Sequence, residues 1–130
     1  MKKDFKKWHT KKEFLHHEKE RPFFHERKIW FCMLGLNVGF EQDGSGQEFL
    51  RPVLIIKKFN NEVFWGLPLT KTTKRGKYYH QFYIEGKKDI STVVLSQIRL
   101  IDAKRLQYKI GDLNEKGFLE IKKCLIEFLR

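Results

Sequence analysis

The chain has 130 residues, of which 27 are Lys or Arg and 16 are Asp or Glu, so its formal net charge is +11 with neutral histidines. This length fits one globular domain, and the 41% hydrophobic and 15% aromatic residues can form a core, which excludes a wholly disordered chain. No apolar run approaches the roughly 20 residues of a membrane helix, and the basic N-terminus lacks the apolar stretch of a signal peptide, so we expect a cytoplasmic protein without a membrane segment.

The net charge indicates the kind of partner, and the two cysteines bear on whether the chain has a disulfide or a zinc site. Cys32 and Cys124 lie in apolar segments and have no CxxC spacing, so we expect two small buried side chains and neither a disulfide scaffold nor a zinc site. Each Lys or Arg placed on a phosphate releases condensed counterions, so the positive charge favours a polyanionic partner. Nucleic acid is the first candidate partner, and an acidic protein is the second. We expect no cofactor.

Residues 1–27 are expected to form a basic N-terminal extension of helical character. Good helix formers run over 4–20, Asp4 is placed to cap the first turn, and Pro22 disfavours a continuing helix. The apolar residues at roughly helical spacing are Phe5, Trp8 and Leu15. Because this apolar stripe is thin, the helix should pack one edge on the domain or on a partner.

Residues 28–130 change to the pattern of β-strands. Apolar runs that fill both faces, or alternate, predict strands over 29–34, 51–57, 63–69, 78–85, 91–95 and 97–101. The dipeptide Asn60-Asn61 marks a turn, because asparagine tolerates positive φ. Short strands at spacings of about 8–12 residues are typical of a small barrel or sandwich.

The C-terminal segment returns to helical spacing. The residues from Asp112 to Glu115 have the spacing of a capping box. The apolar residues that follow at helical intervals are Phe118, Ile121, Leu125 and Phe128. The predicted helix should close one side of the barrel.

Four segments in chain order carry the strongest functional signal. They are Gly35-Leu-Asn-Val-Gly-Phe-Glu-Gln42, Arg51-Pro-Val-Leu-Ile-Ile56, Pro68-Leu-Thr70 with the basic loop after it, and Leu95-Ser-Gln-Ile-Arg-Leu-Ile-Asp102. Each is weak alone, but together they resemble the PemK/MazF family of toxin endoribonucleases over about residues 28–130.

The resemblance implies a mainly β fold with α-helices. This fold is a small SH3-like barrel of the PemK/CcdB type, with a closing C-terminal helix and, in this chain, an extra N-terminal helix. It also implies a homodimer that cleaves single-stranded RNA at specific sequences without a metal. An active RNA-cleaving enzyme must be restrained, so an antitoxin is expected. The net charge indicates that this antitoxin is acidic.

The same resemblance assigns the reaction to Arg51 and Thr70. When a ribose 2′-hydroxyl attacks the neighbouring phosphate, negative charge grows on the phosphoryl oxygens. A planar guanidinium can donate two hydrogen bonds to these oxygens, and a threonine hydroxyl can donate another. The products would be a cyclic phosphate and a 5′-hydroxyl end.

The acceptor of the 2′-proton stays open. Arginine remains protonated near neutrality and is a poor general base. Glu41 in the Gly-rich loop is the best carboxylate candidate, and the resemblance also places a functional glutamate there. His80 is the rival, although as part of Tyr78-Tyr-His-Gln-Phe82 it reads more simply as a strand residue.

RNA contact is assigned mainly to the basic loop that follows Thr70. The residues are Gln42, Lys71, Thr72, Lys74, Arg75, Lys77 and Gln97. The loop cations would surround a phosphate held at Thr70, although they could also simply keep a loop tip in solution. A metal reading of His16, His17, Glu18 and His25 fails because no HExxH spacing exists.

Two other classes of function remain possible from the sequence. One is a non-catalytic SH3-like module that binds RNA or protein, and the other is a CcdB-like topoisomerase poison. The pair of Arg51 and Thr70 favours the ribonuclease, because a pure binding module does not need it. The extension over residues 1–27 and the lengthened loop over 44–50 depart from the family pattern.

Overall fold

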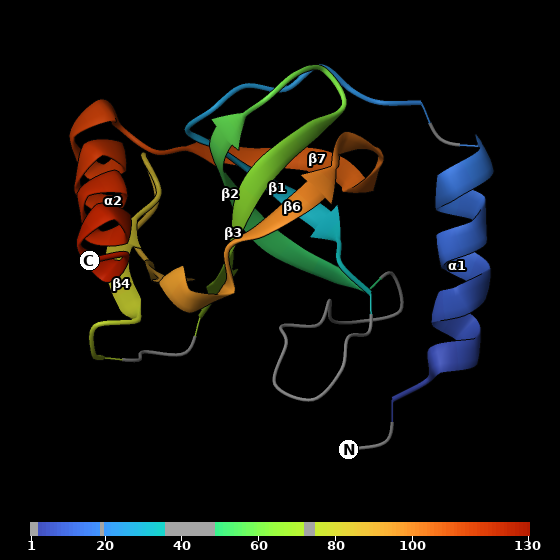
Figure 1. Ribbon diagram of the computed structural model, residues 1–130, viewed down its shortest axis with the longest axis horizontal. Helices are drawn as coiled ribbons and strands as arrows, with labels where there is room; N and C mark the ends of the chain where they lie inside the picture. Colours follow the sequence, from blue (N-terminus) through green and yellow to red (C-terminus); the bar gives the residue numbers. More distant parts are fainter. Residues whose placement is uncertain (1–2, 19, 36–48, 72–74) are drawn as a thin grey trace.

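The computed structural model describes residues 3–18, 20–35, 49–71 and 75–130 of the chain. A mainly antiparallel sheet lies between two terminal helices, with α1 and α2 on opposite sides of the molecule (Figure 1). The helices and strands are α1 (Phe5–Glu18), β1 (Lys28–Met33), β2 (Leu50–Lys58), β3 (Val63–Thr70), β4 (Tyr79–Tyr83), β5 (Ile90–Val94), β6 (Arg99–Asp102), β7 (Leu106–Asp112) and α2 (Glu115–Phe128). Two short 3₁₀ turns, η1 (Leu95–Gln97) and η2 (Ala103–Arg105), flank β6.

The strands follow the order β4-β5-β3-β2-β1-β7, and β6 pairs with β3 beside this path. All the pairings are antiparallel. No ladder within the described ranges joins β4 to β7, so the expected closure of a barrel is not shown. A single backbone hydrogen bond, from Glu85 N to Asp112 O at 3.0 Å, connects the chain just after β4 to the end of β7.

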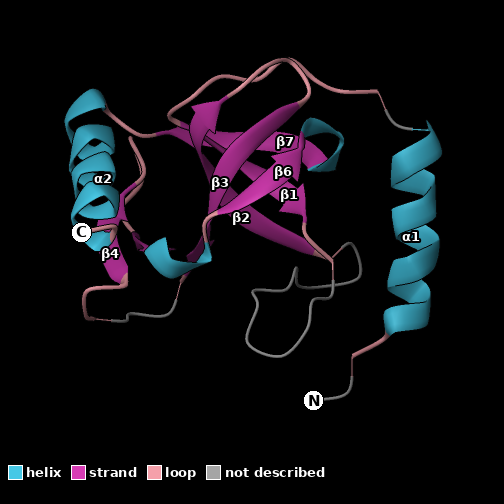
Figure 2. Ribbon diagram, viewed as in Figure 1, coloured by secondary structure: helices cyan, strands magenta, loops and turns pink. Residues whose placement is uncertain are grey.

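The core has two apolar layers because strand residues alternate between the faces of the sheet. On β2, Leu54 and Ile56 belong to the layer under α2, whereas Val53 and Ile55 belong to the other layer. Burial on both faces, which the apolar run in the sequence predicts, is confirmed for this strand. Figure 2 shows the strands as the central body of the molecule.

Helix α2 packs its apolar side against the first layer. Phe118 and Ile121 are buried there, beside Phe82 of β4. The predicted cap at Asp112 is wrong, because the Asn114 side chain caps the helix by accepting a hydrogen bond from Gly117 N at 2.7 Å. Asp112 instead ends β7, where its carboxylate pairs with lysines.

Helix α1 contacts the sheet through a small apolar cluster. Its Trp8 and Leu15 pack with Met33 and Phe49, and Asp4 Oδ1 accepts a hydrogen bond from Lys7 N at 3.0 Å, which confirms the predicted cap. Phe5, expected on the same stripe, is 51% exposed. The helix therefore attaches through a short part of its surface.

Other local predictions need correction. Gln97 lies in η1 and not in a strand, and the strand β7 was not predicted from the sequence. The predicted turn at Asn60 is confirmed; it forms without positive φ, and the Asn60 side chain accepts hydrogen bonds from Glu62 N and Val63 N at 2.7 and 2.9 Å. Both cysteines are free, but only Cys32 is fully buried.

None of the helices in the described part of the chain combines the length and the apolar character that a membrane span requires.

Candidate active site

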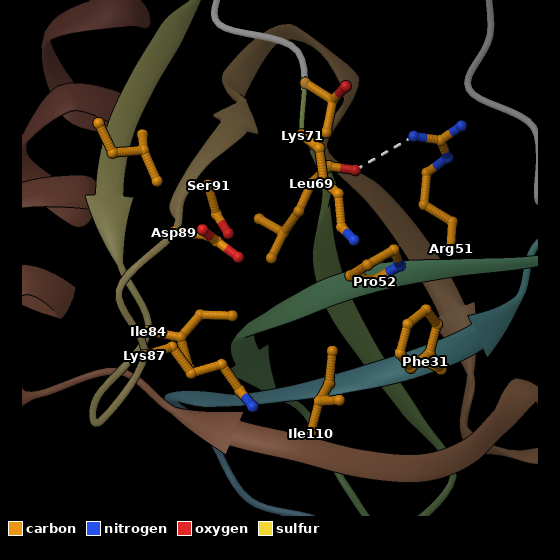
Figure 3. Close-up of a pocket in the computed structure, with 12 residues that line it drawn as sticks. Phe31, Arg51, Pro52, Leu69, Lys71, Ile84, Lys87, Asp89, Ser91 and Ile110 are labelled. Atoms are coloured by element: carbon orange, nitrogen blue, oxygen red, sulfur yellow. Dashed lines mark hydrogen bonds between the residues drawn. The ribbon is translucent and has the colours of Figure 1, made fainter.

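A cavity of about 620 Å³ opens where the ends of β2 and β3 meet β5 and β7. Its lining combines cations, one carboxylate and apolar side chains. The lining residues are Phe31, Arg51, Pro52, Leu69, Thr70, Lys71, Ile84, Lys87, Asp89, Ile90, Ser91 and Ile110 (Figure 3).

Strand pairing brings Arg51 and Thr70 to this cavity from segments 19 positions apart in the sequence. In the antiparallel ladder of β2 and β3, Val53 lies opposite Pro68, and extending that register by two residues sets Arg51 opposite Thr70. The Arg51 guanidinium donates a hydrogen bond from Nη1 to Leu69 O at 3.2 Å. The structure therefore brings the two predicted catalytic residues together, and the guanidinium is anchored beside the end of β3.

Cations and apolar side chains both line the cavity. Lys71 directly follows Thr70, and Lys87 lies in the turn between β4 and β5. The apolar part includes Phe31, whose ring lies 5.0 Å from that of Tyr108, and Ile110 of β7. Such a lining can hold a phosphate beside an apolar or aromatic group.

Among the described residues, three further candidates for RNA binding, Arg75, Lys77 and Gln97, are not part of the cavity lining. Arg75 and Lys77 are exposed, and Lys77 Nζ lies 5.2 Å from the centroid of the Tyr78 ring. Gln97 is half-buried in η1. The predictions on Glu41, Gln42, Thr72 and Lys74 lie outside the described residues.

His80 lies outside the cavity and contacts helix α2. On β4 its Nδ1 lies 3.7 Å from Cys124 Sγ of α2, and its Nε2 lies 4.0 Å from Glu120 Oε2. It is absent from the cavity lining. Its interpretation as a strand residue is confirmed.

Lys87 and Asp89 are lining residues that the sequence reasoning did not select. Both lie in the segment Gly86-Lys-Lys-Asp89, which reads as an ordinary turn between two strands. Its position becomes visible only when β5 pairs with β3, which sets Thr92 opposite Thr70. The sequence alone therefore carries no signal that would have selected these two residues.

The aspartates with shifted pKa values stabilise the scaffold and do not line the cavity. Hydrogen bonds from Lys109 and Lys28 lower the pKa of Asp112. Burial raises the pKa of Asp102, but the hydrogen bonds from Arg21 and from the backbone of Lys104 outweigh it and leave this pKa lowered. Both carboxylates are thus committed to structural pairs.

The described residues offer no cluster of ligands for a metal ion. Among them, no group of three or more His, Cys, Asp or Glu side chains is placed to hold one.

A cavity lined by cations at paired strand ends, with an arginine and a threonine among its lining residues, has the chemistry to bind a phosphate. The sequence profile of the PemK-like, MazF-like toxins of type II toxin-antitoxin systems matches residues 26–129. The chain belongs to this family of toxins. No curated protein sequence is significantly similar to it.

Solved structures share the fold at low sequence identity. Toxin MazF-mt6 of Mycobacterium tuberculosis is 18% identical, with a TM-score of 0.61 over 79% of this chain and 96% of that one. MazF of Deinococcus radiodurans is 16% identical, with a TM-score of 0.60 over 85% of this chain and 97% of that one. A mycobacterial endoribonuclease in complex with its cognate antitoxin is 14% identical, with a TM-score of 0.60 over 83% and 94%.

Proposed function

We propose that this toxin is an endoribonuclease that cleaves single-stranded RNA, including mRNA, at specific sequences and without a metal. The 2′-hydroxyl attacks the adjacent phosphorus, and the products are a cyclic phosphate and a 5′-hydroxyl end. The observation that carries this proposal is the cavity in which Arg51 and Thr70 lie together. Family membership supports the same activity.

Arg51 and Thr70 supply hydrogen bonds to the phosphate as its charge grows. The guanidinium is fixed, since one of its nitrogens already donates to Leu69 O. Preorganised donors of this kind lower the barrier because they need little reorientation during the reaction. Lys71 and Lys87, from the same lining, attract the RNA backbone to the site.

We propose that the RNA-binding surface extends beyond the cavity to the basic loop that follows Thr70. Arg75 and Lys77 are exposed and follow the cavity-lining Lys71 by four and six positions in the sequence, and we expect them to meet neighbouring phosphates. Gln42, Thr72, Lys74 and Gln97 remain proposed contacts, and Glu41 remains a proposed catalytic carboxylate. A homodimer stays a prediction, as does the division of the chain at residue 27.

An acidic antitoxin is the proposed partner. One similar structure contains a mycobacterial endoribonuclease with its cognate antitoxin, and this chain carries a net charge of +11. An acidic segment that occupies the cationic cavity would compete with RNA for Arg51.

The test is cleavage of a long single-stranded RNA by the purified protein in EDTA. Wild type should cleave the RNA, whereas Arg51→Ala and Thr70→Ala should lose about 10²–10³ in rate, because each removes a donor to the developing charge. Arg130→Ala is the matched control, since this arginine lies at the exposed end of the chain and pairs only with Glu127 among the described residues. A folded Arg51→Ala protein with wild-type activity would contradict the site assignment. RNA binding without cleavage by wild type would favour a binding module.

A further inference from the structure

We propose that Asp89 is the general base that accepts the 2′-proton in this cleavage, because its carboxylate lines the cavity on the side opposite Arg51. This assignment rests on the proposed function. Figure 3 shows Asp89 and Ser91 on one side of the cavity and Arg51 on the other, with Leu69 and Lys71 between them. A ribose and its phosphate bound between these walls would meet a proton acceptor on one side and phosphate donors on the other.

The reaction needs such an acceptor, and the other lining groups do not provide it. A guanidinium has no acceptor site, and an ammonium must first lose a proton. His80 is directed at Cys124 and Glu120 of α2 and does not line the cavity. Asp89 is the only carboxylate among the lining residues of the described chain.

The Asp89 carboxylate is also available, unlike several others in the fold. Asp102 is bound by both Nε and Nη2 of Arg21, at 3.0 and 2.9 Å. Asp112 is paired with two lysines, and Glu26 Oε2 accepts a hydrogen bond from Lys58 N at 2.8 Å. Within the described parts of the chain, Asp89 makes no side-chain hydrogen bond or ion pair. Its acceptor capacity is therefore open to a ligand.

The charged groups around Asp89 suit a substrate that brings a phosphate. Arg51 comes from β2, Lys71 follows β3, and Lys87 lies two residues before Asp89 in the same turn. These cations attract the phosphate into the cavity. An ionised carboxylate has no proton to donate, so Asp89 can accept a proton from a neutral hydroxyl but is not suited to bind the phosphate itself.

The proposed step conserves atoms and electrons. Asp89 takes the proton from the ribose O2′, and the electron pair of O2′ forms a new bond to phosphorus. The bond from phosphorus to O5′ breaks, and its electron pair stays on O5′, which takes a proton from water. Arg51 and Thr70 donate hydrogen bonds to the phosphoryl oxygens throughout, and Asp89 later returns its proton to solvent.

The experiment measures the pH dependence of RNA cleavage for wild type, Asp89→Asn, Asp89→Glu and Glu41→Gln. Each protein is also tested for binding to the same sequence made with 2′-deoxyribose, which lacks the attacking hydroxyl. Glu85→Gln is the control, because this residue is exposed in the same connection between β4 and β5 and its loss changes the net charge by the same amount. Thermal unfolding shows that each variant is folded.

We expect Asp89→Asn to cleave about 10²-fold or more slowly near neutrality, as is typical for loss of a general base. Its rate should rise steadily with pH as hydroxide replaces the carboxylate, whereas binding of the deoxy strand stays within about threefold of wild type. Asp89→Glu should recover part of the rate and the wild-type shape of the pH profile. Glu85→Gln should behave as wild type.

Any one of the following results would overturn the assignment. Asp89→Asn with wild-type rate and pH profile would exclude a base at this position. If Asp89→Asn cleaves slowly because it binds the deoxy strand more weakly, or if it cleaves at a different sequence, Asp89 is a residue that contacts the nucleobase of the RNA and not the general base. If Glu41→Gln is the one variant whose cleavage rate no longer falls toward acid pH, Glu41 and not Asp89 is the general base. If wild type cleaves no RNA, the proposed function fails, and the role of Asp89 fails with it.

Discussion

At the scale of single residues, Gly35 lies directly against the Trp8 side chain of helix α1. Its φ is +73°, a left-handed conformation that disfavours side chains. A Cβ placed there would clash with the indole ring of Trp8. Gly35 thus satisfies two constraints at once, one set by the backbone and one by the packing of α1.

Gly35→Ala should therefore lower the free energy of unfolding by more than backbone strain alone would lower it. Gly86→Ala is the matched control, because Gly86 has a φ of +79° and a Cβ on it would meet nothing within 4 Å. The control should lose about 1–2 kcal/mol from the left-handed conformation. Gly35→Ala should lose more and should also shift Trp fluorescence to the red, since Trp8 is only 6% exposed. Equal melting temperatures for the two variants would contradict the close approach.

Patterns in the sequence single out Arg51 and Thr70, and the structure places both on the lining of the cavity. The sequence does not single out Asp89 and Lys87, because a charged turn residue looks the same whether it faces solvent or a cavity. Only the pairing of β5 with β3 places that turn beside the cavity. Long-range pairing is information that a local pattern does not contain.

At the scale of elements, β7 is the part of the sheet that the sequence did not reveal. Its residues Leu106-Gln-Tyr-Lys-Ile-Gly-Asp112 are largely polar, and most are exposed or half-buried, so they lack a clear alternation of apolar residues. The strand is held instead by its pairing with β1. The capping error at α2 has a related cause, because two acceptors, Asp112 and Asn114, both precede the helix.

Asp112 provides a test of how β7 is attached to β1. Its Oδ1 lies 3.1 Å from Lys28 Nζ of β1 and 2.9 Å from Lys109 Nζ of β7. The hydrogen bonds from these lysines lower the pKa of Asp112. The unfolded chain therefore binds the proton more readily, so the pairs stabilise the fold above the unfolded pKa of about 4 and lose this effect as pH falls through the folded pKa.

Asp112→Asn should reduce the free energy of unfolding at neutral pH, by no more than about 1 kcal/mol because the pairs are partly exposed to solvent. The difference from wild type should shrink as pH falls below about 4. Urea unfolding at several pH values measures this. Glu127→Gln, which breaks an exposed pair with Arg130, is the control and should change little. A destabilisation that is constant with pH would mean that the charge of Asp112 is not the cause.

At the scale of the whole molecule, α1 is joined to the sheet at several separate points. Trp8 and Leu15 contribute an apolar contact, and Lys104 Nζ donates a hydrogen bond to His16 O at 2.7 Å. Arg21, which follows the helix, binds Asp102 of β6. The sequence predicted an appended helix with one packed edge, and these contacts show which edge it is. It could not predict the polar contacts, because their partners lie more than 80 positions away.

The positive charge of the molecule is distributed over many elements, so its effect on RNA binding should depend on position. Lys71 lines the cavity, whereas Lys123 is exposed on α2. Lys71→Glu and Lys123→Glu change the net charge equally, yet only Lys71 lies where a bound phosphate is proposed. A cation that contacts a phosphate contributes to the salt dependence of binding through counterion release, whereas a distant cation contributes little.

We therefore expect Lys71→Glu to weaken binding to a single-stranded RNA and to lower the slope of log K against log salt by about 1. Lys123→Glu should leave that slope nearly unchanged. The Arg51→Ala background, which should be too slow to degrade the RNA, allows the affinity to be measured by fluorescence anisotropy at several salt concentrations. Equal loss of affinity in both variants would show that RNA responds to the total charge of the protein. In that case the cavity would not be the principal site of phosphate contact.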